Sequence, residues 1–109
     1  MANTFKLKTK ANVGVTTVGI YTAPAATTTV VIGITLANTS GSGVKVGVGI
    51  TRAGTTEDVK LLKNAPIPQG SSLEFMGGNK VVLETTDTVT VDSDTNNSVD
   101  AALTIMEIT

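Results

Sequence analysis

The 109-residue sequence contains no cysteine and no histidine. Without cysteine the chain can form no disulfide framework and offers no thiolate nucleophile, and without histidine no ordinary catalytic triad can form. Tryptophan is also absent, so the only aromatic side chains are Phe5, Tyr21 and Phe75. The core must therefore consist of aliphatic side chains, which bury less area per residue than aromatic rings. We expect a homo-oligomer, because association would add buried area.

Charged residues make up only 16% of the sequence, compared with roughly 25% in an average globular protein. The net charge is −1, but residues 1–56 carry five bases and no acid, whereas residues 57–109 carry nine acids and three bases. This asymmetry indicates either complementary faces that meet between subunits or charges scattered over the surface of an interleaved fold.

No stretch is long and apolar enough to cross a membrane as a helix. Residues 6–26 loosely mimic a secretory signal peptide, in which a basic segment precedes an apolar one. Their apolar part lacks leucine and contains Asn12, two glycines and two threonines. We therefore predict a strand there, and no membrane partner.

The dominant hydrophobic period is two, which is the period of a strand with one buried face. Threonine and valine dominate these alternating runs, and β-branched residues pack well on a pleated surface. The alternation predicts four sets of core-facing residues: Val30, Ile32, Ile34 and Leu36; Val44, Val46, Val48 and Ile50; Val89 and Val91; Val99, Ala101, Leu103 and Ile105.

Turn-forming residues separate the runs at near-regular spacing. We predict a hairpin loop at 38–43, turn-rich connections at 66–72 and 76–79, and a loop at 92–98. The segment 55–65 fits a short helix, a strand or a single turn. The pattern predicts an all-β fold: an antiparallel β-sandwich or jelly-roll-like fold of about eight or nine short strands, as a single domain over residues 1–109.

Acidic side chains form no recognisable catalytic motif. A paired-carboxylate site would have to use residues from a set without motif spacing: Glu57, Asp58, Glu74, Glu84 and Asp87. We therefore expect a protein that is not an enzyme and that uses no cofactor.

One acidic loop has metal-ligand spacing. Asp92, Asp94 and Asn96 alternate as in a calcium loop. However, Asn97 occupies the place of the sharp-turn glycine, and Leu103 that of the bidentate glutamate. We interpret the segment as a polar loop without a metal site, with a calcium site as the alternative.

The N-terminal segment 4–10 places Lys6, Lys8 and Lys10 on one face of a predicted strand, with Phe5 and Leu7 on the other. These lysines are the candidate partner contacts. The segment is either a docking strand for an acidic surface or an edge strand whose lysines prevent edge-to-edge pairing. Nucleic acid is not an expected partner, because the chain is acidic overall and no aromatic residues are interleaved with the lysines.

Gly47 and Gly49 share the face opposite Val46 and Val48. Glycine inside a strand often marks a bulge or the close approach of another backbone. The pair indicates either tight packing against another segment or subunit, or a flexible, twisted strand.

Four stretches, taken in chain order, form one series of structural features. The series begins with a Tyr-Thr-Ala-Pro turn that leads into a strand ending near Asn. A later Lys-x-Ala-Pro-Ile-Pro connection leads to Leu-Glu and then to a strand that runs into Thr-Asp. The stretches are IYTAPAATTTVVIGITLANTSGSGVKVGVGI (20–50), LLKNAPIPQGSSLEF (61–75), GGNKVVLETTDTVTV (77–91) and VDAALTIMEI (99–108). In this order the chain resembles small structural proteins of tailed bacteriophages, especially those of aquatic bacteria including cyanobacteria.

This resemblance implies a non-enzymatic virion component, assembled in the cytoplasm of the host bacterium. It implies most directly a capsid cement or decoration protein, commonly a trimer, that binds and stabilises the shell of the major capsid protein. The alternatives are a tail, baseplate, neck or fibre-associated protein and a carbohydrate-binding adhesion module, for which Tyr21 is the one plausible stacking ring. The resemblance supplies no binding residues.

Overall fold

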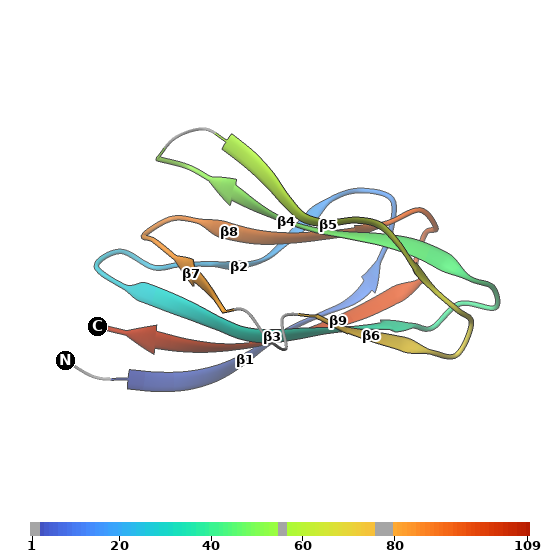
Figure 1. The fold of residues 1–109 in the computed structure, drawn as a ribbon, viewed down its shortest axis with the longest axis horizontal. Coiled ribbons are helices and arrows are strands. Elements are labelled where there is room, and N and C mark those ends of the chain that lie inside the picture. The colour runs from blue at the N-terminus through green and yellow to red at the C-terminus, as the bar shows by residue number, and fades with distance from the viewer. Residues whose placement is uncertain (1–2, 55–56, 76–79) are drawn as a thin grey trace.

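The computed structural model describes residues 3–54, 57–75 and 80–109, which contain nine strands and no helix. The strands form two antiparallel sheets that face each other (Figure 1). The first sheet has the order β1 (Asn3–Val13), β9 (Val99–Ile108), β3 (Thr28–Asn38) and β6 (Ser72–Phe75), and β7 (Val81–Leu83) also pairs with β3. The second sheet has the order β2 (Val18–Thr22), β8 (Thr88–Ser93), β4 (Val44–Arg52) and β5 (Glu57–Ile67).

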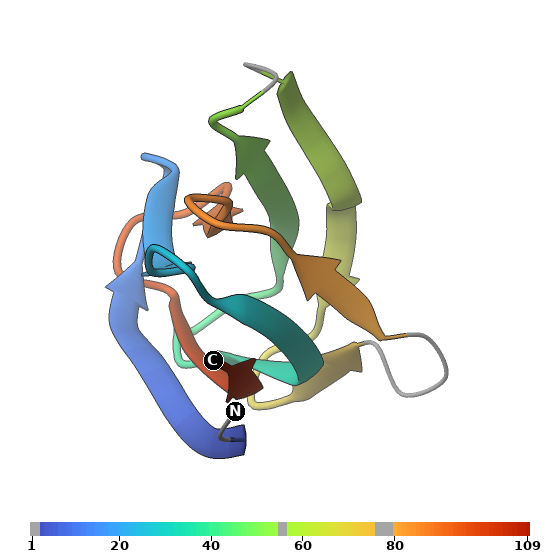
Figure 2. The same cartoon turned by 90° about the vertical axis from the view of Figure 1, so that its left-hand side faces the viewer.

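Most connections cross from one sheet to the other. Successive strands alternate between the sheets except for β4–β5 and β6–β7, each of which stays within one sheet. This arrangement is jelly-roll-like, and it confirms the predicted all-β antiparallel sandwich. Figure 2 shows the two layers from the end at which β1 begins and β9 terminates. No helix in the described part of the chain is long and apolar enough to cross a membrane.

Aliphatic side chains from both sheets fill the space between the layers. The predicted inward faces of β4, β8 and β9 are confirmed, because all ten of their predicted core residues are buried. Leu36, Leu103 and Ile105 are fully buried at the centre of the first sheet. Among the side chains that the structure describes, the buried cluster is aliphatic except for Tyr21.

The predicted facing of β3 is wrong in its first half. Val31 is buried, whereas Val30 and Ile32 are half-buried, and only Ile34 and Leu36 face the core as predicted. The cause is a bulge: Val31 pairs with Ile105 of β9 and Gly33 with Thr104. Ile32 is therefore one extra residue, and it inverts the inward and outward positions on its N-terminal side.

The segment 38–43 is not a hairpin loop. It joins β3 in the first sheet to β4 in the second, so the predicted local pairing does not form. The Asn38 side chain holds the crossing by donating to the carbonyls of Ser42 (2.9 Å) and Ile67 (3.0 Å) and accepting from the Ser40 amide (2.9 Å). Hydrophobic alternation cannot distinguish a hairpin from a crossing between sheets, because in either case both strands have one buried face.

The segment 55–65 forms strand β5 from Glu57 onwards, and not a helix. Two register shifts against β4 break its ladder, which explains its irregular hydrophobic pattern. Pro66 lies within this strand because β5 is at the edge of its sheet, where a missing N–H is tolerated. The predicted turn at 76–79 and residues 55–56 lie outside the described residues.

Gly47 and Gly49 allow close packing within the chain. A Cβ atom at Gly47 would lie 2.7 Å from Asp92 Oδ1, and one at Gly49 would lie 2.9 Å from the Val59 carbonyl oxygen. The predicted close approach is therefore made by neighbouring segments of the same chain.

The bulge makes a matched pair of substitutions informative. Val31→Ala should lower the free energy of unfolding by about 2 kcal/mol, because it removes buried methyl groups and leaves a cavity. Val30→Ala, one residue earlier on the outer face, should cost under about 1 kcal/mol. Urea denaturation measures both values. A larger loss for Val30→Ala would show that β3 has the simple alternation instead.

Candidate functional site

A polar network of four residues, three of them buried, lies between the sheets. The Tyr21 hydroxyl donates to Glu107 Oε2 at 2.6 Å and lies 2.8 Å from Thr29 Oγ1. Lys6 Nζ lies 2.8 Å from Glu107 Oε1. Since the tyrosine proton is directed to Glu107, the Thr29 hydroxyl is the donor in its own bond with Tyr21. We call these residues the Tyr21–Glu107 network.

The strands bring this network together from four places in the sequence. Glu107 of β9 pairs directly with Thr29 of β3, so both project from the same face of the first sheet. Lys6 of β1 pairs with Ile105, two residues before Glu107. Tyr21 belongs to β2 in the second sheet. The network therefore ties the two sheets together.

Burial and hydrogen bonding perturb both acids of the network. Burial, followed by the bond to Glu107, raises the pKa of Tyr21 to about 12. The bonds from Lys6 and then from Tyr21 lower the pKa of Glu107, against the opposing effect of burial. Near neutral pH the network therefore holds a neutral phenol, a carboxylate and an ammonium group, all in contact with partners in the chain.

The sequence contained one signal for this network. The alternating run Val99, Ala101, Leu103 and Ile105 continues to position 107, so its period places Glu107 on the core face. An acid on a core face needs a buried partner. The identity of that partner was not predictable, because the bulge in β2 and the bulge in β3 set the facing of Tyr21 and Thr29.

The lysine strand is β1, at the edge of the first sheet. Lys6, Lys8 and Lys10 pair with Ile105, Leu103 and Ala101, whose side chains face the core, so the three lysines project from the inner side of the sheet. Phe5 and Leu7 lie on the outer side and are 69% and 64% exposed. Lys6 ion-pairs with Glu107, whereas the structure gives Lys8 and Lys10 no ion pair within the described residues.

The loop that carries Asp92, Asp94 and Asn96 directs its oxygens to different partners. Asp94 Oδ1 accepts the Lys45 amide at 3.1 Å, and Asp92 Oδ2 accepts the Thr17 hydroxyl at 3.0 Å. The two carboxylates therefore bind the segments of Thr17 and Lys45, which agrees with the interpretation of this segment as a polar loop. The described residues include no cluster of three potential acidic, histidine or cysteine metal ligands.

The five acids considered for a paired-carboxylate site lie in three places. Glu57 and Asp58 begin β5, Glu74 is on β6, and Glu84 and Asp87 lie in the turn before β8. That turn is tied to β4, since Arg52 contacts Asp87 at 3.0 Å and Glu84 at 3.3 Å. Buried Asp87 also accepts the Glu84 amide at 2.9 Å.

The ion pairs of Lys6 and Arg52 both join a base of the first half of the chain to acids of the second half. The charge asymmetry of the sequence is therefore partly balanced within one chain, because the fold interleaves its halves.

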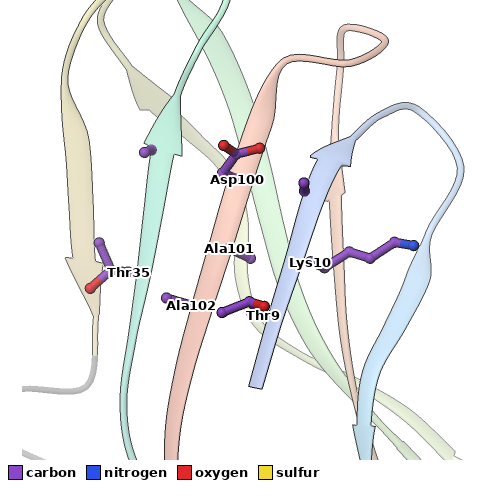
Figure 3. Close-up of a pocket in the computed structure, with 8 residues that line it drawn as sticks. Thr9, Lys10, Thr35, Asp100, Ala101 and Ala102 are labelled. Carbon is purple, nitrogen blue, oxygen red and sulfur yellow. The ribbon is translucent and has the colours of Figure 1, made fainter. Parts of the chain in front are cut away.

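The outer face of the first sheet carries a shallow depression of about 320 Å³ between β1, β9 and β3. Thr9, Ala102 and Thr35 lie across its floor, and the Lys10 side chain extends away from them (Figure 3). The lining offers methyl and hydroxyl groups. The stacking ring proposed for a sugar site is not available there or elsewhere, because Tyr21 is buried in its network.

No protein-family model matches the chain, and no curated protein matches it. Among solved structures, the chain is similar to one from Bacillus endospore appendages, described as a family of disulfide-linked pili. The TM-score is 0.57 at 17% identity, and the match covers 99% of this chain and 87% of the other. At this identity the similarity shows a shared fold. The present chain has no cysteine with which to form such links.

Tyr21→Phe tests the tie between the sheets. Loss of the hydroxyl should lower the free energy of unfolding by about 1–3 kcal/mol, because Glu107 and Thr29 would be buried with one partner fewer. The control is Thr22→Val, which removes an exposed hydroxyl from the next residue of β2 and should cost under about 0.5 kcal/mol. Equal losses in urea denaturation would contradict the structural role of the network.

The only tyrosine in the chain gives a direct pH test. Ultraviolet titration of its phenolate should give a pKa of about 12, above the ordinary value of about 10. The unfolded phenol loses its proton first as the pH rises, so this group should lower folding stability between these two values. Glu107→Gln should bring the pKa down while burial keeps it raised. An ordinary pKa in the folded protein would show that the hydroxyl is not in this network.

Proposed function

We propose that this protein is a non-enzymatic structural subunit that acts by binding within a large assembly. The observation that carries the proposal is that the buried polar groups bond to other residues of the same chain and not to an open site. The Tyr21–Glu107 network and buried Asp87 all bond to other parts of the same chain. Functional polar groups are usually aimed into a concave site, whereas these hold strands and turns in place.

The similarity to an endospore appendage protein supports the proposal at the level of fold, because that protein comes from appendages described as pili. Without cysteine, the present chain cannot form disulfide links between subunits, so its assembly would use other contacts. Repeated weak contacts suit such a subunit, since many linked copies act at high effective concentration.

The finer form of the proposal is a decoration protein on the capsid of a tailed bacteriophage, bound to the major capsid protein as a homo-oligomer. It is supported by the sequence resemblance over residues 20–50, 61–75, 77–91 and 99–108. The fold adds an outer sheet face with little charge, in which Phe5, Met106, Val30 and Val82 form one row across four strands. An apolar row of this kind suits contact with another protein surface.

A second candidate is a self-assembling surface appendage, and the structural match favours it. The two candidates differ in what the protein binds first. An appendage subunit associates with copies of itself, whereas a decoration protein needs the shell.

Copy number in purified particles tests the proposal. Quantitative mass spectrometry of virions from the source of this chain should find hundreds of copies per particle for a capsid protein. A small multiple of three or six would place it in the tail instead. Absence from virions, with filaments formed by the purified protein in electron micrographs, would favour the appendage. Absence from virions together with a monomer at all concentrations would overturn the structural proposal.

A further inference from the structure

The free edge of β1 is the longest unpaired feature of the first sheet. β1 has 11 residues and pairs only with β9, so its other flank carries no strand among the described residues. Every second residue of an edge strand directs its N–H and C=O away from the sheet. The edge therefore presents a row of hydrogen-bonding groups that another strand can pair with.

The two faces of β1 differ in charge between Phe5 and Lys10. Exposed Phe5 ends the apolar row of the outer face, and exposed Leu7 lies two residues further along the same face of β1. The inner side carries Lys6, Lys8 and Lys10 at every second position, without an acid in the strand. A strand that pairs here would meet apolar groups on one side and ammonium groups on the other.

Lysines on an edge strand prevent pairing only with strands that are themselves positively charged. They do not prevent pairing with an acidic strand. Lys6 already contacts Glu107, and Lys8 lowers the pKa of the same carboxylate through its charge. Lys10 forms no ion pair with the described residues. Opposite charges facing each other across two strands stabilise their pairing, whereas like charges destabilise it.

A second copy of this chain does not supply a matching strand within the described residues. Two β1 strands side by side would oppose their lysines. The other edge strands carry too few acids: β2 has none, β6 has only Glu74, and in β5 each alternate set holds one acid and one lysine. The matching partner is therefore a different protein.

We infer that the free edge of β1 is a docking site for an extended segment of another protein, with acids at alternate positions and apolar residues between them. The acids face Lys8 and Lys10, and the apolar residues extend the row that begins at Phe5. Backbone bonds supply affinity, and the alternating side chains supply specificity. The inference rests on the proposed structural role, to which it adds the chemistry of the partner.

Two synthetic peptides test this inference on the intact protein: an alternating valine–glutamate peptide and an alternating valine–lysine peptide. The glutamate peptide should bind, and binding should weaken as salt rises. Hydrogen exchange should slow in residues 3–13 and not in β5. The lysine peptide should not bind.

Charge reversal identifies the residues responsible. Lys8→Glu/Lys10→Glu should weaken binding of the glutamate peptide by about tenfold or more and create binding of the lysine peptide. Lys60→Glu/Lys63→Glu makes the same charge change on the edge of the second sheet and should leave binding unchanged. If the first variant fails to fold, Lys8→Gln/Lys10→Gln should still weaken binding, without creating affinity for the lysine peptide.

Three results would overturn the inference: no binding of the glutamate peptide, equal loss in both reversed variants, or protection outside β1. A self-association that competes with the peptide would assign the edge to a second copy. Each of these results leaves the copy number in particles unaffected, so the docking edge can fail while the proposed structural function stands.

Discussion

The hydrogen bond between Tyr21 and Glu107 joins the two sheets at the end of the sandwich where β1 begins and β9 terminates. Aliphatic packing holds the centre of the two sheets, but packing is non-directional and does not fix their relative position at the end where β1 begins and β9 terminates. A charged carboxylate in that position is tolerated only because a phenol and a lysine satisfy it. This directional contact, with its bonds to Thr29 and Lys6, therefore joins side chains of four strands: β1, β2, β3 and β9.

Hydrophobic periodicity predicted the all-β fold and the inward faces of β4, β8 and β9, because residues of these strands alternate without interruption in register with a buried face. It failed at β3, where the single extra residue Ile32 inverts the facing of Val30 and Val31. It failed again at 38–43, because a sheet crossing and a hairpin require the same turn residues. Both failures concern pairing between distant strands, which a local pattern does not record.

The candidate site was likewise predictable only in part. The sequence identified the lysine strand and its two faces, and the edge position of β1 agrees with both of its interpretations. It did not indicate that Lys6 is committed to Glu107, which lies at the other end of the chain. The distinction matters for function, because the commitment of Lys6 leaves Lys8 and Lys10 as the positive charges of β1 without an ion pair among the described residues.

The pairing of β1 with β9 also has a temporal consequence. β1 precedes all the other described strands and pairs only with β9, so the strand that carries the lysines has no sheet to join until β9 has been synthesised. Non-local pairing of this kind is slow to form, because a long loop must close before any contact is gained. A partner that binds β1 only as the edge of a formed sheet would therefore select folded molecules over nascent chains, in which β9 is not yet available.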